Sequence, residues 1–77
     1  MYLTVTMRLC GNDYDIEADR LLSVEKAAMA VSESMRLYEG RSLPMFYKSA
    51  QQGRVICRTF TFEQAGVQSG DILTAVE

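Results

Sequence analysis

The chain has 77 residues and a formal net charge of −2, so we expect one domain over residues 1–77 and no nucleic-acid partner. Histidine is absent, which removes the commonest general acid/base and the commonest metal ligand. No apolar run approaches the roughly 20 residues of a membrane span, and the start, MYLTVTMRL, does not have the pattern of a secretion signal.

The first two predicted elements are strands. Residues 2–10 and 13–19 alternate between apolar and polar side chains, which is typical of half-buried strands. Gly11-Asn12 suits a two-residue hairpin turn between them. This turn predicts three apolar cross-strand pairs: Leu9 with Tyr14, Met7 with Ile16, and Val5 with Ala18.

Residues 24–38 then repeat apolar side chains at three- and four-residue spacing, which predicts an amphipathic helix. Ser23 is the expected N-cap and Gly40 the expected left-handed residue that ends the helix. The predicted core-facing stripe consists of Val24, Ala27, Ala28, Val31, Met35 and Tyr38.

The second half predicts three short strands over residues 43–48, 54–57 and 71–77. Within 54–57 the pattern leaves open whether Val55 or Ile56 points inward. Thr61 and Gln64 fit a capping box, which predicts a short helical turn over residues 62–65. The order β-β-α-β-β-short helix-β indicates an α+β domain, in which the helix covers one face of a mixed sheet of four to five strands.

The stretch TFEQAGVQSGDIL resembles the closing motif of the ubiquitin β-grasp fold. The resemblance implies that the strands, counted along the chain, lie in the order 2-1-5-3-4. It also implies that Phe62 and Val67 anchor the core and that Leu73 points inward.

MYLTVTMRL and GVQSGDIL together resemble the YukD group of small bacterial ubiquitin-like proteins. That resemblance implies a cytoplasmic, non-conjugated accessory of a Gram-positive type VII (ESX, WXG100) secretion system, with secretion components as protein partners. A homodimer also remains open, because a short β-grasp domain has exposed edges.

The outer face of the predicted sheet is the candidate protein-binding surface. If Leu73 and Ala75 point inward, residues 72, 74 and 76 point outward, and if Met45 and Tyr47 point inward, residues 46 and 48 do the same. The candidate binding residues are Phe46, Lys48, Ile72, Thr74 and Val76. Apolar side chains with a polar rim are typical of interaction surfaces, although scattered apolar residues are also common on proteins that bind nothing there.

A second feature is the acidic strip, which we define as Asp13, Asp15, Glu17 and Asp19. Four carboxylates spaced two apart can bind a cation or an arginine-rich partner, but the glycine and closing glutamate of a calcium loop are missing. In the predicted register Arg8 lies opposite Asp15. We expect a solvated edge strand that discourages aggregation.

The remaining candidate residues are the two cysteines and two apolar residues of the helix. Cys10 and Cys57 form no CxxC pair, so free thiols are expected, although a disulfide remains open. Met29 and Leu37 fall off the helix stripe. They are expected either to pack under the loop at Leu43 or to be exposed, although a second contact surface or a dimer seam remains open. No catalytic, cofactor-binding or metal-ligating set can be found, so we expect a protein that is not an enzyme and holds no cofactor.

Two functional alternatives stay open. The chain can be the N-terminal ubiquitin-like domain of a type VII secretion membrane component. It can also belong with the sulfur carriers and protein modifiers, although those are activated at a C-terminal Gly-Gly, and Val76-Glu77 offers neither glycine nor slack.

Overall fold

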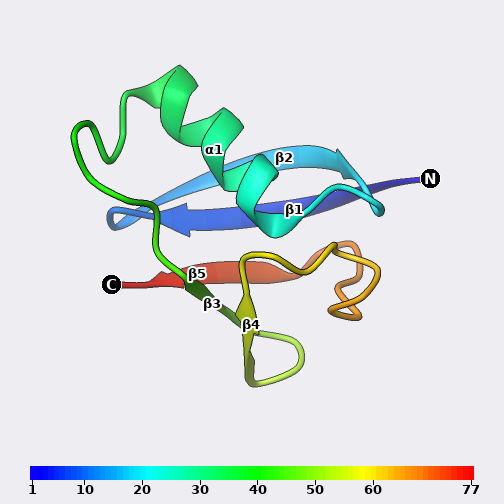
Figure 1. The fold of residues 1–77 in the computed structure, drawn as a ribbon. Helices are drawn as coiled ribbons and strands as arrows, with labels where there is room; N and C mark the ends of the chain where they lie inside the picture. The colour runs from blue at the N-terminus through cyan, green and yellow to red at the C-terminus, as the bar shows by residue number, and fades with distance from the viewer.

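A computed structural model describes residues 1–77 as a five-stranded mixed sheet with one helix across one face (Figure 1). The elements are β1 (Tyr2–Leu9), β2 (Asn12–Asp19), α1 (Val24–Met35), β3 (Phe46–Ser49), β4 (Arg54–Cys57) and β5 (Ile72–Val76). The sheet order is β2-β1-β5-β3-β4, with β1 and β5 parallel and the other pairs antiparallel. The predicted α+β class and strand order are therefore confirmed.

The N-terminal hairpin forms as predicted, but its turn is one residue earlier. Cys10 and Gly11 occupy the two turn positions with φ values of 51° and 79°, and Leu9 pairs with Asn12. The predicted Gly11-Asn12 turn was therefore wrong. The three predicted apolar pairs were also wrong, because each β1 residue pairs with a β2 residue two positions earlier than predicted. Because a shift of two keeps every side chain on its own face, the alternation of apolar residues could not reveal the error.

The new register changes the partner of Arg8, which lies opposite Asp13 and not Asp15. The Arg8 guanidinium donates to the Asp13 carboxylate, with its Nε 2.7 Å from Oδ1. Asp15 lies opposite Thr6 and accepts a hydrogen bond from the Thr6 hydroxyl at 2.6 Å.

Helix α1 begins where the sequence indicates, since the Ser23 hydroxyl accepts a hydrogen bond from the Lys26 amide at 3.1 Å. It ends at Met35, three residues earlier than predicted. Arg36 and not Gly40 ends it, with a left-handed φ of 58° and its amide bonded to the Ser32 carbonyl. Tyr38 is still buried but lies in the following loop, whereas Met35 is exposed, against prediction.

Strand β4 has the predicted bounds, whereas β3 and β5 begin later than predicted, β3 extends one residue further, to Ser49, and β5 ends one residue earlier, at Val76. Strand β3 begins at Phe46, two residues after Pro44, which cannot donate a ladder hydrogen bond. The capping box is confirmed, because the Thr61 amide donates to the Gln64 side chain and the Gln64 amide donates to the Thr61 hydroxyl, both at 3.0 Å. Residues 62–66 form a hydrogen-bonded turn that includes one helical bond, from the Ala65 amide to the Thr61 carbonyl.

The core lies between α1 and the inner face of the sheet. Phe62, Val67 and Leu73 are buried in it, as the β-grasp resemblance implies. The other buried apolar side chains are Val5, Met7, Leu9, Ala18, Val24, Ala27, Ala28, Val31, Tyr38, Tyr47, Ile56 and Ala65. The opposite face of the sheet carries no covering element, so its side chains face solvent (Figure 1).

Candidate protein-binding surface

The five predicted binding residues meet on the uncovered face of the sheet. Phe46 of β3 lies opposite Val76 of β5, and Lys48 lies opposite Thr74. Ile72 lies two residues before Thr74 in β5 and pairs with Thr6 of the neighbouring strand β1. Residues separated by about thirty positions in the sequence therefore share one surface because β5 runs between β1 and β3.

The alternation that brings them together is the predicted one in both strands. Tyr47 and Leu73 have no exposed surface, whereas Phe46 is 45% and Val76 49% exposed. Ala75 is half-buried against the core. Met45 was predicted to point inward and does not, since it is 49% exposed. It precedes the first residue of β3, so the alternation of that strand does not extend to it.

Strand β4 adds two residues that the sequence did not assign to this surface. Val55 lies opposite Lys48 and is 54% exposed, while Cys57 lies opposite Phe46. Ile56 is buried, which settles the orientation that the four-residue pattern left open. Ile56 points inward because it pairs with the inward residue Tyr47. That pairing depends on the length of the turn between β3 and β4, which the pattern within β4 does not give. We name the outer-face patch as Phe46, Lys48, Val55, Cys57, Ile72, Thr74 and Val76.

The charge on this surface is unevenly distributed. Lys48, at the centre of the outer-face patch, takes part in none of the four ion pairs of the structure. Arg8, on the next strand but one, is already paired with Asp13. The hydrogen bond from Arg8 holds the pKa of the Asp13 carboxyl below its usual value, and the same bond raises the pKa of Arg8. The ammonium group of Lys48 is therefore a cation without an ion-pair partner, and it lies among the apolar side chains of the outer-face patch.

Both cysteines are free thiols, so no disulfide joins Cys10 to Cys57. The Cys57 sulfur lies 3.3 Å from the Thr59 hydroxyl oxygen. This hydrogen bond and a second one to the Thr59 backbone lower the pKa of the thiol, and the positive charge of Arg58 contributes less. No carboxylate, cysteine and histidine group in the structure could hold a metal ion. The chemistry that the outer-face patch offers is thus apolar contact, one cation and one partly exposed thiol.

The residues off the helix stripe behave differently from each other. Leu37 is half-buried and packs against the core, whereas Met29 is 42% exposed. Both line a shallow hollow beside Tyr38 and Leu43, and its volume is about 390 Å³. This hollow lies on the helix side of the molecule and is separate from the outer-face patch.

No helix of the structure has the length and apolar character needed to cross a membrane.

Neither the known family models nor the curated proteins include a match to this chain. Solved structures do resemble it. The solution structure of the C-terminal ubiquitin-like domain of mouse tubulin-specific chaperone e matches with a TM-score of 0.66 and 18% identity, covering 95% of this chain and 82% of that one. A ubiquitin of Caldiarchaeum subterraneum matches with a TM-score of 0.65 and 17% identity, covering 100% of this chain and 96% of that one. The chain therefore has the ubiquitin-like β-grasp fold.

Proposed function

We propose that this protein is a non-enzymatic, non-conjugated ubiquitin-like module that binds another protein through the outer-face patch. The observation that carries the proposal is the pairing of Phe46 with Val76 beside the unpaired Lys48. Large apolar and aromatic side chains with a polar rim are a composition typical of protein interfaces, and Lys48 can add charge complementarity to an acidic group of the partner.

The rigidity of the surface supports the same proposal. Five of the seven patch residues lie on β3 and β5, and the turn before β5 is held by the buried carboxylate of Asp71. That carboxylate accepts hydrogen bonds from the amides of Gln51 and Ile72 at 3.0 and 2.8 Å. Because the backbone under the patch is already ordered, binding through it costs little conformational entropy.

The partner that we propose is a component of a type VII (ESX, WXG100) secretion system in the cytoplasm of a Gram-positive bacterium. The support for this finer assignment is the resemblance of MYLTVTMRL and GVQSGDIL to the YukD group. The same residues are compatible with an N-terminal domain of a type VII membrane component. The outer-face patch would bind a partner in the same way in a free accessory protein and in such a domain.

Contacts of Glu77, the residue that follows β5, support the proposal that the protein is not conjugated to other proteins. The Tyr38 hydroxyl donates a hydrogen bond to the Glu77 carboxylate, and the Cys10 thiol lies 3.9 Å from the same oxygen. A modifier needs an extended segment after the last strand to reach the site of its activating enzyme, whereas these contacts hold Glu77 against the domain. Incubation with ATP and an adenylating enzyme of the ubiquitin-activating type should leave the intact mass unchanged; an adenylate or thiocarboxylate would contradict this part of the proposal.

The binding test uses purified type VII components, namely the secretion ATPase and WXG100 proteins, titrated against the wild-type protein and its variants by calorimetry. Phe46→Asp and Val76→Asp place a charge in the centre of the proposed interface and should weaken binding at least tenfold. Met29→Asp is the matched control, because it adds the same charge to an exposed apolar residue on the helix side. Equal loss in all three variants, or none in the patch variants, would contradict the assigned surface. The absence of binding to every component would contradict the secretion assignment.

A further inference from the structure

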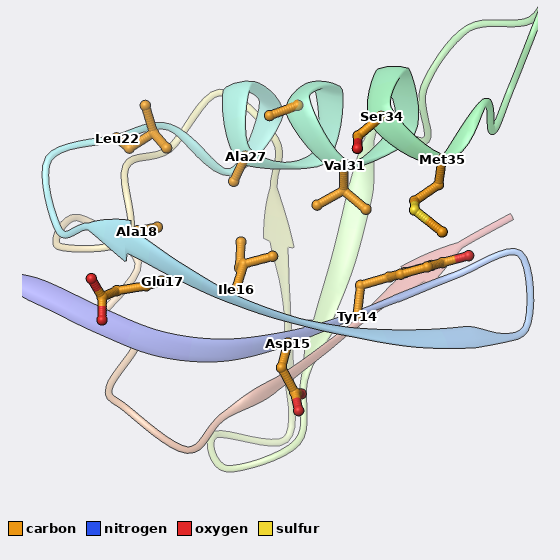
Figure 2. A pocket seen from close by; sticks show the side chains of 11 residues that line it. Tyr14, Asp15, Ile16, Glu17, Ala18, Leu22, Ala27, Val31, Ser34 and Met35 are labelled. Carbon is orange, nitrogen blue, oxygen red and sulfur yellow. The ribbon is translucent and has the colours of Figure 1, made fainter.

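A groove of about 370 Å³ runs between strand β2 and helix α1, on the side of the sheet opposite to the outer-face patch. Figure 2 shows Tyr14 and Ile16 of β2 facing Val31 and Met35 of α1 across it. Tyr14 and Ile16 are only half-buried, although the β1 residues beside them are wholly buried. The inner face of β1 is thus buried at Val5 and Met7, whereas that of β2 is partly open at Tyr14 and Ile16. We name this feature the β2–α1 groove.

The groove is bordered by an unpaired strand edge. Strand β2 is the first strand of the sheet order and pairs only with β1. The Thr6 amide donates to the Asp71 carbonyl at 3.0 Å, and the Thr4 carbonyl accepts from the Gly70 amide at 2.8 Å, so both residues direct these backbone groups toward β5. Since the residues of an antiparallel pair alternate between bonded and non-bonded, their partners Asp15 and Glu17 direct their own N–H and C=O groups away from β1. An incoming strand therefore meets two donors and two acceptors.

The side chains of the same edge residues carry the acidic strip. Figure 2 shows Asp15 and Glu17 pointing away from the groove, to the outer side of β2. Arg8 is paired with Asp13, and no other cation forms an ion pair with the strip. Glu17 is exposed and accepts no side-chain hydrogen bond. The edge therefore presents uncompensated negative charge on one side and an apolar groove on the other.

We propose that the β2–α1 groove and the edge of β2 form a second binding site, which takes an extended peptide segment of alternating aliphatic and basic residues. Such a segment adds a strand beside β2 and bonds to the backbone of Asp15 and Glu17. Successive side chains of a strand point to opposite faces, so its aliphatic residues enter the groove beneath α1 while its lysines or arginines lie beside the acidic strip. The site is separate from the outer-face patch on β3, β4 and β5, and this proposal does not depend on that patch.

The charge pattern also argues against a second copy of this chain as the occupant. Two β2 strands placed edge to edge would bring the carboxylates of two acidic strips beside one another, and like charges directly opposite destabilise a strand pair. Acidic edge strands are a known means of preventing such pairing. A basic partner removes this penalty, so the same residues that oppose self-association favour the proposed segment.

The test is a titration of the isotopically labelled protein, followed by amide chemical shifts, with an acetylated and amidated seven-residue peptide that alternates lysine and valine. We expect saturable shifts in β2 and in the groove-facing part of α1. A peptide that alternates glutamate and valine should bind at least tenfold more weakly. Shifts confined to the outer-face patch, or equal binding of the two peptides, would overturn the proposal.

Variants of the protein test separately the contribution of the acidic strip and that of the open groove to peptide binding. Asp15→Lys/Glu17→Lys should weaken binding of the lysine peptide at least tenfold, whereas the matched control Glu33→Lys/Glu39→Lys, which reverses two exposed charges elsewhere, should not. Ala30→Phe fills the groove from an exposed position of α1 and should also abolish the shifts. Equal behaviour of the two charge-reversed variants would show non-specific attraction and overturn the proposed site. The dispersion of the amide spectrum confirms that each variant is folded.

Strand addition itself is tested without changing the protein. Two isomers of the lysine peptide, methylated on the backbone nitrogens of the lysines or of the valines, each block one edge of the added strand. We expect one isomer to lose binding and the other to keep it; equal affinity of both with the parent peptide would overturn the strand geometry. Concentration-dependent shifts of β2 without peptide would instead identify a second copy as the occupant.

Discussion

The hydroxyl of Ser49 donates a hydrogen bond to the carboxylate of Asp71, and neither residue has any exposed surface. The bond joins the end of β3 to the turn that starts β5. The other oxygen of Asp71 accepts from the amides of Gln51 and Ile72. One buried carboxylate therefore connects the two strands that carry most of the outer-face patch.

The first prediction concerns this carboxylate. Asp71→Ala leaves the Ser49 hydroxyl and two amides without their partner, so we expect a loss of about 3 kcal/mol or more in the free energy of unfolding, since each unsatisfied buried group costs about 1–3 kcal/mol. Urea denaturation measures the change. Asp13→Ala, at an exposed ion pair, is the matched control and should change stability little. Similar effects of the two substitutions would contradict the role assigned to Asp71.

The second prediction concerns Tyr47, whose hydroxyl is buried without a hydrogen-bond partner. Replacing the tyrosine with phenylalanine removes an unsatisfied polar group and keeps the ring in the core. Tyr47→Phe should therefore leave the free energy of unfolding unchanged or raise it by up to about 1 kcal/mol. A clear loss of stability in urea denaturation at neutral pH would show that the hydroxyl has a partner in solution.

The third prediction is a pH dependence at the same residue. Burial raises the pKa of Tyr47 from 10.0 to about 12, so the folded protein keeps the phenol proton at pH values where the unfolded chain loses it. The folded state then binds more protons than the unfolded state between pH 10 and 12, and stability falls as pH rises through this range. Urea denaturation at pH 9 and pH 11 should show a smaller decrease for Tyr47→Phe than for the wild type. Equal decreases would contradict the raised pKa.

The fourth prediction concerns the hairpin turn. Gly11 has a φ of 79°, and a Cβ built on it meets no heavy atom within 4 Å. Gly11→Ala is therefore strained by its backbone conformation alone and should cost about 1–2 kcal/mol. Gly11→Asn should cost less, because asparagine tolerates left-handed conformations better. Thermal unfolding of the two variants measures the difference, and equal melting temperatures would contradict the left-handed turn.

The fifth prediction concerns the contact between Tyr38 and Glu77. Tyr38→Phe removes the hydrogen bond to the Glu77 carboxylate and should increase amide exchange at Val76 and Glu77, while exchange at Leu73, near the start of β5, stays slow. The expected order at the end of β5 also maintains the position of Val76 in the outer-face patch. Unchanged exchange at both terminal residues would show that the contact does not hold this end of the chain.

Local patterns in the sequence were sufficient for the type of each element. Period-two alternation identified β1 and β2, helical spacing identified α1, and the capping box at Thr61 identified the turn after β4. The parity of β3 and β5 followed from the same alternation, so Phe46, Lys48, Ile72, Thr74 and Val76 were assigned to one face correctly. These features depend on residues close together in the chain, and the sequence records them directly.

Only the tertiary structure decided the features that join distant residues. The hairpin register, the early end of α1 at Arg36, and the positions of Val55 and Cys57 beside Lys48 and Phe46 all depend on backbone dihedrals and strand pairing. Alternation is unchanged when a strand moves by two residues, so it cannot choose between such registers. The β2–α1 groove exists because the packing of the helix buries Val5 and Met7 of β1 but leaves Tyr14 and Ile16 of β2 half-exposed. The sequence by itself thus determined most of the side chains that face the core, because alternation within an element is local, whereas Met35, Met45 and the choice between Val55 and Ile56 were decided by where the elements end and pair.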